Sequence, residues 1–111
     1  MVMAVKIGVL ITTNDPESAW NAFRYCISAV QGGHAVRVYL LGKGVECEGI
    51  TDAKFNVKEK MNEFATKGGT IGACEACLEF RSKGATELCP ITHMKDLVDI
   101  TVDSDKMISF G

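Results

Sequence analysis

The chain alternates short, nearly continuous apolar runs with longer segments in which apolar residues recur at helical spacing. Residues 4–12, AVKIGVLIT, are rich in β-branched residues, which predicts a strand buried on both faces of a parallel sheet. Residues 35–41, AVRVYLL, predict a second such strand. Residues 70–73 predict a short third strand, residues 86–91 are the candidate for a fourth, and residues 106–110 alternate as a closing strand does.

Helical periodicity fills the segments between these runs. Asp15 and Pro16 are typical of a helix start, and the pair Gly32–Gly33 is typical of its end. The apolar face of this first helix consists of Trp20, Phe23, Ile27 and Val30. Asn56 followed by Glu59 resembles a capping box for a second helix, whose apolar face consists of Val57, Met61, Phe64 and Ala65.

Two further helices are predicted towards the end of the chain. One starts at Cys74, directly after the third strand, and Thr92 is expected to cap the other, which carries Met94, Leu97 and Val98. Repeated strand–helix units with helical crossovers predict an α/β fold with a mainly parallel five-stranded sheet flanked by helices. The length of 111 residues predicts a single domain over residues 1–111.

Charge and hydropathy exclude two classes of partner. The 12 basic and 14 acidic residues give a net charge of −2, whereas nucleic-acid binding needs a basic surface, so no nucleic-acid partner is expected. No apolar run reaches the roughly 20 residues of a membrane span. The N-terminal stretch MVMAVKIGVLITT lacks the basic region of a signal peptide, and we therefore expect a cytoplasmic protein.

The side chains with the clearest potential for chemical reactivity are the cysteines, of which the chain has five. An odd number without a signal peptide argues against a disulfide scaffold, so each thiol is core filler, a metal ligand or a reactive group. In the segment GACEACLEFRSKG, residues 72–84, Cys74 falls at the carboxyl end of a strand and at a helix start, where thiolates are favoured. Cys77 follows one helical turn later, and the Glu75 carboxylate is expected to raise the pKa of Cys74.

Several interpretations of this thiol pair stand side by side. Both cysteines can be core filler, because free cysteine is among the most buried residues. A thioredoxin-type redox pair is disfavoured, since Glu-Ala between the thiols lacks the usual proline or aromatic residue. Cys74, Cys77, Cys89 and His93 have a spacing that resembles a Cys3His zinc site, although a helix and a turn separate the two halves. An iron–sulfur cluster is a weaker alternative.

The other candidate residues have simpler interpretations. Cys26 is expected to be half-buried core on the first helix, and Cys47 is expected to be a loop cysteine that packs inward rather than a second exposed thiol. His93 is expected at the surface. Arg81 and Lys83 are interpreted as favourable charges at the negative end of the helix that starts at Cys74.

Four stretches together resemble the DsrE/DsrF-like family, which includes sulfur-relay proteins of the TusD type. They are IGVLITTNDPESAWNAF, GGHAVRVYLLGKGVE, GACEACLEFRSKG and THMKDLVDITVDSDKMISF, and they span nearly the whole chain. The resemblance implies a flavodoxin-like α/β fold and assembly as homo-oligomers, trimers or hexamers.

The resemblance also implies a chemistry. Some members hold sulfane sulfur as a persulfide on one cysteine, and counting back seven positions from Arg81 assigns that role to Cys74. Cys77 is then an auxiliary thiol, which many members have and the TusD-like carriers lack. Such a carrier needs sulfur donor and acceptor partners but no metal or organic cofactor. A Cys3His metal-binding module and a non-catalytic oligomeric interaction protein are the alternatives, and whether the chain is an enzyme stays open.

Overall fold

A computed structural model describes residues 3–111 and shows a five-stranded sheet in the order β4-β3-β2-β1-β5. All four pairings between neighbouring strands are parallel. The strands are β1 (Lys6–Ile11), β2 (Ala35–Leu40), β3 (Thr70–Cys74), β4 (Ile91–Thr92) and β5 (Lys106–Phe110). The predicted α/β fold is therefore confirmed for the described residues, with a wholly parallel sheet. Met1 and Val2 of the expected domain lie outside them.

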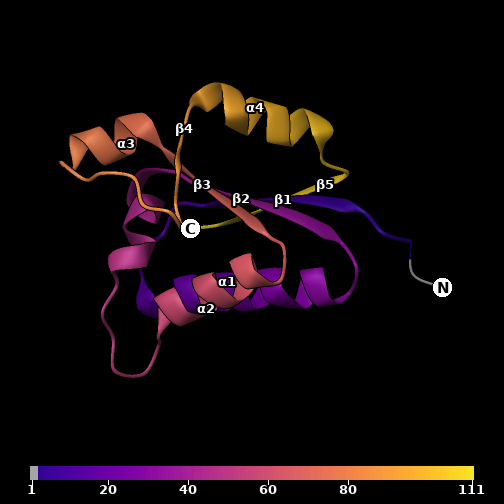
Figure 1. The fold of residues 1–111 in the computed structure, drawn as a ribbon, viewed down its shortest axis with the longest axis horizontal. Helices are drawn as coiled ribbons and strands as arrows, with labels where there is room; N and C mark the ends of the chain where they lie inside the picture. Colours follow the sequence, from indigo (N-terminus) through magenta and orange to yellow (C-terminus); the bar gives the residue numbers. More distant parts are fainter. Residues whose placement is uncertain (1–2) are drawn as a thin grey trace.

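Helices cover both faces of this sheet (Figure 1). They are α1 (Pro16–Gln31), α2 (Val57–Thr66), α3 (Glu75–Phe80) and α4 (Met94–Asp103), and a 3₁₀ helix, η1 (Gly42–Gly49), follows β2. Figure 1 shows α1 and α2 together on one face, and α3 and α4 on the other. None of the helices in residues 3–111 combines the length and the apolar character that crossing a lipid bilayer requires.

The hydrophobic core lies mainly between the sheet and the α1–α2 layer. Val9 and Val38 on neighbouring strands are buried, and so are the rings of Phe23 on α1 and Phe64 on α2, whose centroids are 6.1 Å apart. On the opposite face, which α3 and α4 cover, Tyr39 of β2 and Leu78 of α3 are buried. Alternate residues of a strand point to opposite faces, so β2 contributes Val38 to one layer and Tyr39 to the other.

The helix starts and ends follow local signals. The Asp15 carboxylate accepts a hydrogen bond from the Ser18 N–H at 2.9 Å, as expected of an N-cap. Asn56 Oδ1 accepts from the Glu59 N–H at 3.1 Å and caps α2. Gly33 has a φ of 91°, the left-handed conformation that ends α1 without the steric cost a Cβ would add.

Three local predictions were wrong or incomplete. The fourth strand is Ile91–Thr92 and shares only Ile91 with the predicted range 86–91. Thr92 belongs to that strand, and His93 is the N-cap of α4, with its N–H donating to Asp96 Oδ2 at 2.8 Å. The segment after β2, for which no form was predicted, is the 3₁₀ helix η1. The first two cases depend on the pairing of β4 with β3, which local sequence does not encode.

Candidate functional site

Cys74 is the last residue of β3 and the N-cap of α3. Only 5% of the residue is exposed, so the thiol lies almost wholly below the surface. Its register partner on β4 is Thr92, and the preceding residues are the small Gly72 and Ala73. The sequence placed Cys74 correctly at a strand end and a helix start.

The surroundings of Cys74 favour its thiolate. Burial raises the pKa of Cys74, but the backbone N–H and thiol of Cys77, the neighbouring Tyr39 hydroxyl and the Ala76 backbone N–H lower it. Together these groups outweigh burial, and the pKa of Cys74 lies below its ordinary value. A thiolate is therefore more abundant at Cys74 than at an unperturbed cysteine.

Cys77 differs from Cys74 in both exposure and acidity. It is half-buried, and its Sγ accepts a hydrogen bond from the Gly42 N–H at 3.2 Å. Gly42 has a φ of 57°, which favours glycine at the point where η1 approaches α3. Burial and the neighbouring Cys74 raise the pKa of Cys77, in spite of the Gly42 bond. Cys77 is therefore a protonated neighbour that donates a hydrogen bond to Cys74.

An ion pair connects η1 to α3 behind the two thiols. Arg81 Nε donates to Glu46 Oε2 at 2.6 Å, and Arg81 Nη1 donates to the Cys77 carbonyl oxygen at 3.2 Å. The bond with Arg81 lowers the pKa of Glu46. Arg81 does interact with the end of α3, as predicted, but it also anchors that helix to η1. Lys83 follows the C-cap residue Arg81 by two positions, and its backbone N–H donates to the Leu78 carbonyl oxygen at 2.9 Å, so it also lies at the end of this helix.

The Glu75 carboxylate pairs with His93 and does not have the expected effect on Cys74. The carboxylate lies 3.4 Å from His93 Nε2, and His93 also lies 3.8 Å from Asp96 Oδ2. His93 is exposed, as predicted. The prediction that the carboxylate of Glu75 raises the pKa of Cys74 was wrong in its result, since the net shift of Cys74 is downward.

The remaining three thiols are packed into the interior. Burial raises the pKa of Cys26, Cys47 and Cys89 to about 12 in each case. Cys26 is fully buried and not half-buried as predicted, because α1 lies flat on the sheet. Cys47 packs inward as predicted, and its thiol donates to the Thr13 carbonyl oxygen at 3.4 Å. These thiols are protonated at neutral pH and are poor nucleophiles.

The spacing that suggested zinc does not produce a metal cage. Within residues 3–111, no three or more His, Cys, Asp or Glu side chains are grouped so as to hold a metal ion. Cys89 is buried beside Thr86, and its N–H donates to the Thr86 hydroxyl at 3.0 Å, while His93 pairs with Glu75 at the surface. The Cys3His alternative therefore has no preformed site in this part of the chain.

Comparison with known proteins identifies the family. The profile of the DsrE/DsrF-like family matches residues 5–110, nearly the full length of the chain. The chain belongs to the DsrE/DsrF-like family. No curated protein matches it significantly.

Two solved structures share the DsrE-like fold. A conserved protein of unknown function from Bacteroides thetaiotaomicron is 22% identical, with a TM-score of 0.79, over 98% of this chain and 99% of that one. A protein of unknown function from Methanobacterium thermoautotrophicum is 13% identical, with a TM-score of 0.69, over 95% of this chain and 98% of that one. At these identities the similarity establishes the fold and not an activity.

In this DsrE-like chain, sequence reasoning missed two residues that adjoin Cys74. Tyr39 lies on β2 opposite Gly72, and Thr92 lies on β4 opposite Cys74. The signal available in the sequence was Tyr39 itself, a polar hydroxyl within an otherwise apolar strand run. Its position over β3 depends on strand order and register, which the run does not specify.

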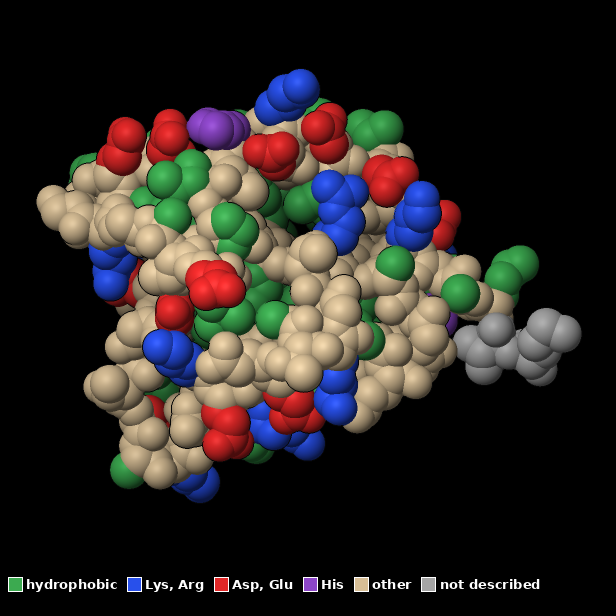
Figure 2. Space-filling view, in the orientation of Figure 1, with side chains coloured by type: hydrophobic (Ala, Val, Ile, Leu, Met, Phe, Trp, Pro, Cys, Tyr) green, Lys and Arg blue, Asp and Glu red, His purple; other side chains and the backbone are tan. Residues whose placement is uncertain are grey.

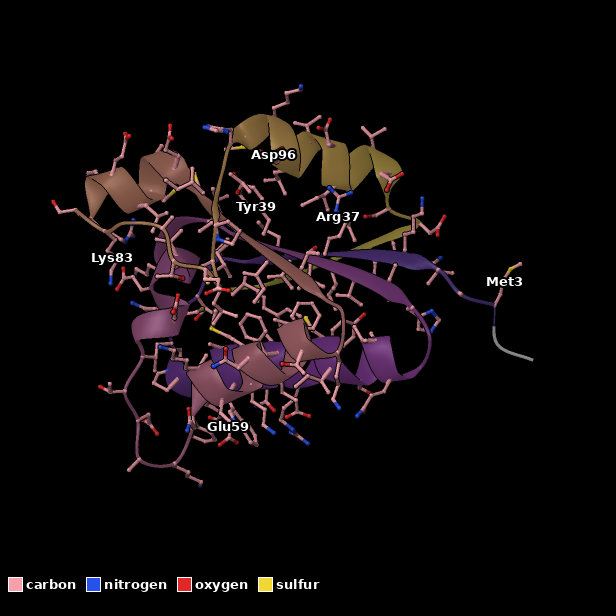
Figure 3. All side chains as sticks on the ribbon, in the orientation of Figure 1. Met3, Arg37, Tyr39, Glu59, Lys83 and Asp96 are labelled. Atoms are coloured by element: carbon pink, nitrogen blue, oxygen red, sulfur yellow. The ribbon has the colours of Figure 1, made fainter. Side chains whose placement is uncertain are left out.

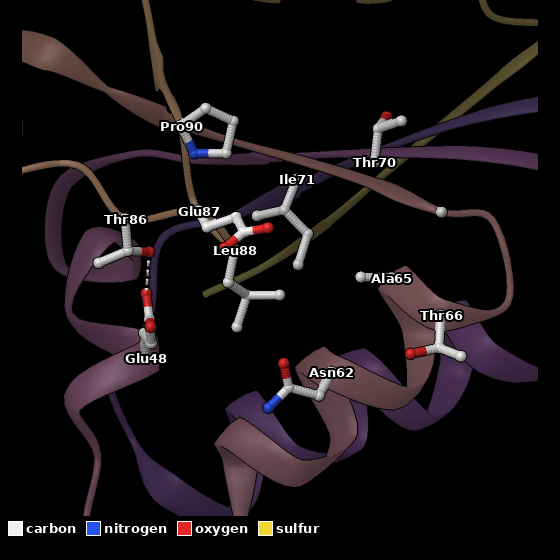
Figure 4. A pocket seen from close by; sticks show the side chains of 11 residues that line it. Glu48, Asn62, Ala65, Thr66, Thr70, Ile71, Thr86, Glu87, Leu88 and Pro90 are labelled. Atoms are coloured by element: carbon white, nitrogen blue, oxygen red, sulfur yellow. Dashed lines mark hydrogen bonds between the residues drawn. The ribbon is translucent and has the colours of Figure 1, made fainter.

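A pocket elsewhere on the molecule has no access to the thiols. It has a volume of about 680 Å³ and lies between α2 and the segment that leads to β4 (Figure 4). Its lining includes Asn62, Thr70 and Leu88, and Thr86 donates to Glu48 at its edge. Neither Cys74 nor Cys77 lines it. We place the candidate site at Cys74 because it is the cysteine whose pKa is lowered, and no cysteine lines this pocket.

Proposed function

We propose that this protein is a sulfur carrier of a sulfur relay and holds sulfane sulfur as a persulfide on Cys74. Membership of the DsrE/DsrF-like family supports a role of the sulfur-relay type. The observation that carries the assignment to Cys74 is that its pKa is lowered, whereas the pKa values of the four other cysteines are raised. Sulfur uptake starts with a thiolate, and Cys74 is the cysteine best suited to be one at neutral pH.

Loading is a displacement at sulfur. The Cys74 thiolate attacks the outer sulfur of a sulfane donor and forms an S–S bond, while the donor's own S–S bond breaks and its electron pair leaves with the donor thiolate. Unloading repeats the exchange: an acceptor thiolate attacks the outer sulfur, and Cys74 leaves as a thiolate. Neither step changes the overall oxidation state, so the cycle needs no external oxidant or reductant.

Cys77 has an auxiliary role in this proposal. Its thiol donates a hydrogen bond towards Cys74 and helps to keep the sulfur anionic. A direct attack of Cys77 on a loaded Cys74 would release the outer sulfur and form a disulfide between the two cysteines. Both residues belong to one turn at the start of α3, so that bond requires the turn to fray.

The persulfide assignment predicts an adduct at one residue. After incubation with polysulfide, we expect the wild-type protein to gain about 32 Da, the mass of one sulfur atom, in a form that dithiothreitol removes. Cys74→Ser is expected to gain nothing, because serine cannot form a persulfide. Intact-protein mass spectrometry measures both.

Cys77→Ser is the matched control, because it removes a thiol of the same turn and is expected to retain the adduct. An adduct of the same size on Cys74→Ser would contradict the assignment to Cys74. Absence of any adduct on the wild-type protein would contradict sulfur carriage altogether.

We also propose that the protein assembles with copies of itself, as trimers or hexamers. The support is an apolar stripe on α4, in which Met94, Val98 and Val102 follow one another at spacings of four residues and are 53%, 54% and 81% exposed. Figure 2 shows apolar side chains interspersed with charged ones over this layer of the molecule. A row of exposed apolar residues on one helix face is typical of an interface, and the family resemblance favours a second copy as its occupant.

Val98→Glu is expected to dissociate this assembly, since the carboxylate would be buried against an apolar partner. Light scattering should then give the mass of a monomer for Val98→Glu and a multiple of it for the wild-type protein. Lys95→Glu changes an exposed polar position of the same helix and is expected to leave the assembly intact. A monomeric wild-type protein at micromolar concentration would contradict self-assembly through this stripe.

A further inference from the structure

The Tyr39 hydroxyl is buried without a hydrogen bond of normal geometry, and it is the one buried side-chain nitrogen or oxygen in residues 3–111 for which this is so. The whole residue is 0% exposed. A buried hydroxyl normally has a partner, because leaving it unpaired sacrifices its bonds to water. An unpaired hydroxyl beside a reactive sulfur therefore calls for a functional explanation.

Strand register directs Tyr39 towards Cys74. Tyr39 pairs with Gly72 across β2 and β3, and Cys74 is two residues further along β3, so all three lie on the same face of the sheet. Gly72 lets the Thr92 side chain pack directly over β3, since a Cβ there would come within 2.6 Å of Thr92 Cγ2 and 2.9 Å of Thr92 Oγ1. Figure 3 shows Tyr39 rising from β2 into the layer of α4, below Asp96.

The Tyr39 hydroxyl has two neighbours of interest, Thr92 Oγ1 and Cys74 Sγ. The Thr92 hydroxyl already donates to the Ala73 carbonyl oxygen at 3.1 Å, so towards Tyr39 it can only accept. Tyr39 is therefore the donor towards either neighbour, and the acceptors available to it are Thr92 Oγ1 and Cys74 Sγ. Burial raises the pKa of Tyr39 to about 12, and this keeps the phenol protonated at neutral pH.

We propose that Tyr39 is the hydrogen-bond donor that stabilises negative charge on Cys74 Sγ, both in the free thiolate and in the thiolate that leaves when sulfur is transferred to an acceptor. This inference rests on the proposed function of Cys74. A fixed donor aimed at the atom where charge develops accelerates the step that develops it. Tyr39 provides such a donor from the buried central strand of the sheet.

Other ionisable groups face the same sulfur and have to be held constant in a test. The Cys77 thiol contributes from α3, and Asp96 lies on α4 close to Tyr39. The Glu75–His93 pair and the Glu46–Arg81 pair lie further out. Removal of the Tyr39 oxygen alone leaves all of these groups in place.

The test is the pH dependence of Cys74 alkylation in Tyr39→Phe. The rate with iodoacetamide, followed for the Cys74 peptide by mass spectrometry, reports the thiolate fraction without any sulfane donor. We expect the midpoint to rise by about one pH unit in Tyr39→Phe, which is a tenfold loss of thiolate below the midpoint. The melting temperature should change little, because the variant keeps the buried ring and removes a hydroxyl that makes no hydrogen bond of normal geometry.

Tyr25→Phe is the matched control. Tyr25 is the other tyrosine of the chain, is 36% exposed on α1 and packs against Phe110, so its substitution is expected to leave the midpoint unchanged. An unchanged midpoint in Tyr39→Phe would overturn the inference. So would an equal rise in both variants.

A second measurement keeps the Tyr39 hydroxyl and changes its strength as a donor. In the Tyr25→Phe background, 3-fluorotyrosine labels only Tyr39 and makes it a stronger donor, so the Cys74 midpoint is expected to fall below that of the unlabelled protein. A midpoint that does not move, or that rises, would overturn the inference. Because alkylation requires no persulfide, the midpoint can shift as predicted even if polysulfide leaves no adduct. That combination would reject the sulfur-carrier function and retain the bond between Tyr39 and Cys74.

Discussion

Gly44→Ala is expected to destabilise the fold by about 3 kcal/mol, near the upper end of the usual cost of overpacking. A Cβ at Gly44 would lie 1.9 Å from the Ile11 carbonyl oxygen and 2.8 Å from its carbon. That oxygen cannot move aside easily, because it accepts the Leu41 N–H at 3.0 Å at the end of the β1–β2 pair. The whole of η1 must therefore shift away from β1.

Because η1 also supports the candidate site, the same substitution is expected to loosen α3. Displacement of η1 weakens the bond from the Gly42 N–H to Cys77 Sγ and the ion pair between Glu46 and Arg81. Thermal unfolding should show a loss in melting temperature on the order of 10 °C. Alkylation of Cys77 should accelerate as its cover is lost.

Gly84→Ala is the control for Gly44→Ala. A Cβ at Gly84 would meet no atom within 4 Å, so the same change there is expected to be neutral or stabilising by less than about 1 kcal/mol. Equal melting temperatures for the two variants would show that the contact between η1 and β1 is not rigid.

Phe64→Ala is expected to cost about 3–5 kcal/mol in the free energy of unfolding, a large share of the total of a small domain. Phe64 is 0% exposed on α2, where its ring contacts Phe23 and covers Gly69. A Cβ at Gly69 would come within 2.1 Å of that ring, so the backbone at the start of β3 packs directly on it. The cavity left by the substitution cannot collapse without moving β3.

Urea unfolding followed by circular dichroism measures this loss. Phe80→Ala makes the same substitution at a side chain on α3 that is 87% exposed, and it is expected to change the free energy of unfolding by less than about 0.5 kcal/mol. If Phe64→Ala lost less than about 1.5 kcal/mol, the core between α2 and the sheet would be less well packed than the structure indicates.

The two substitutions bear on the site in different ways. Phe64 packs against the start of β3 from the α1–α2 face and so supports the strand that ends at Cys74. Gly44 lets η1 approach β1, and η1 in turn holds Cys77 through the Gly42 N–H. Cys74 is therefore positioned by elements from most of the chain length. The thiolate that the sulfur-carrier proposal requires depends on that support as well as on its nearest hydrogen bonds.

The sequence by itself determined the order and type of nearly every element. Its periodicity is local: continuous apolar runs identify strands buried on both faces, and three- and four-residue spacing identifies helices. Capping residues such as Asp15 and Asn56 act within one turn, so the helix starts were also predictable. Cys74 could be placed at a strand end and a helix start for the same reason, since both neighbouring elements have their own local patterns.

Only the tertiary structure decided what surrounds Cys74. The side chains that contact it or its neighbours come from β2, η1 and β4, and their approach depends on strand order and register, which are set by the packing of the whole chain. For that reason the sequence predicted that Glu75 would raise the pKa of Cys74, whereas its polar neighbours Tyr39, Ala76 and Cys77 lower it. A pattern of apolar residues indicates which side chains are buried, but it does not indicate which of them are in contact in the folded chain.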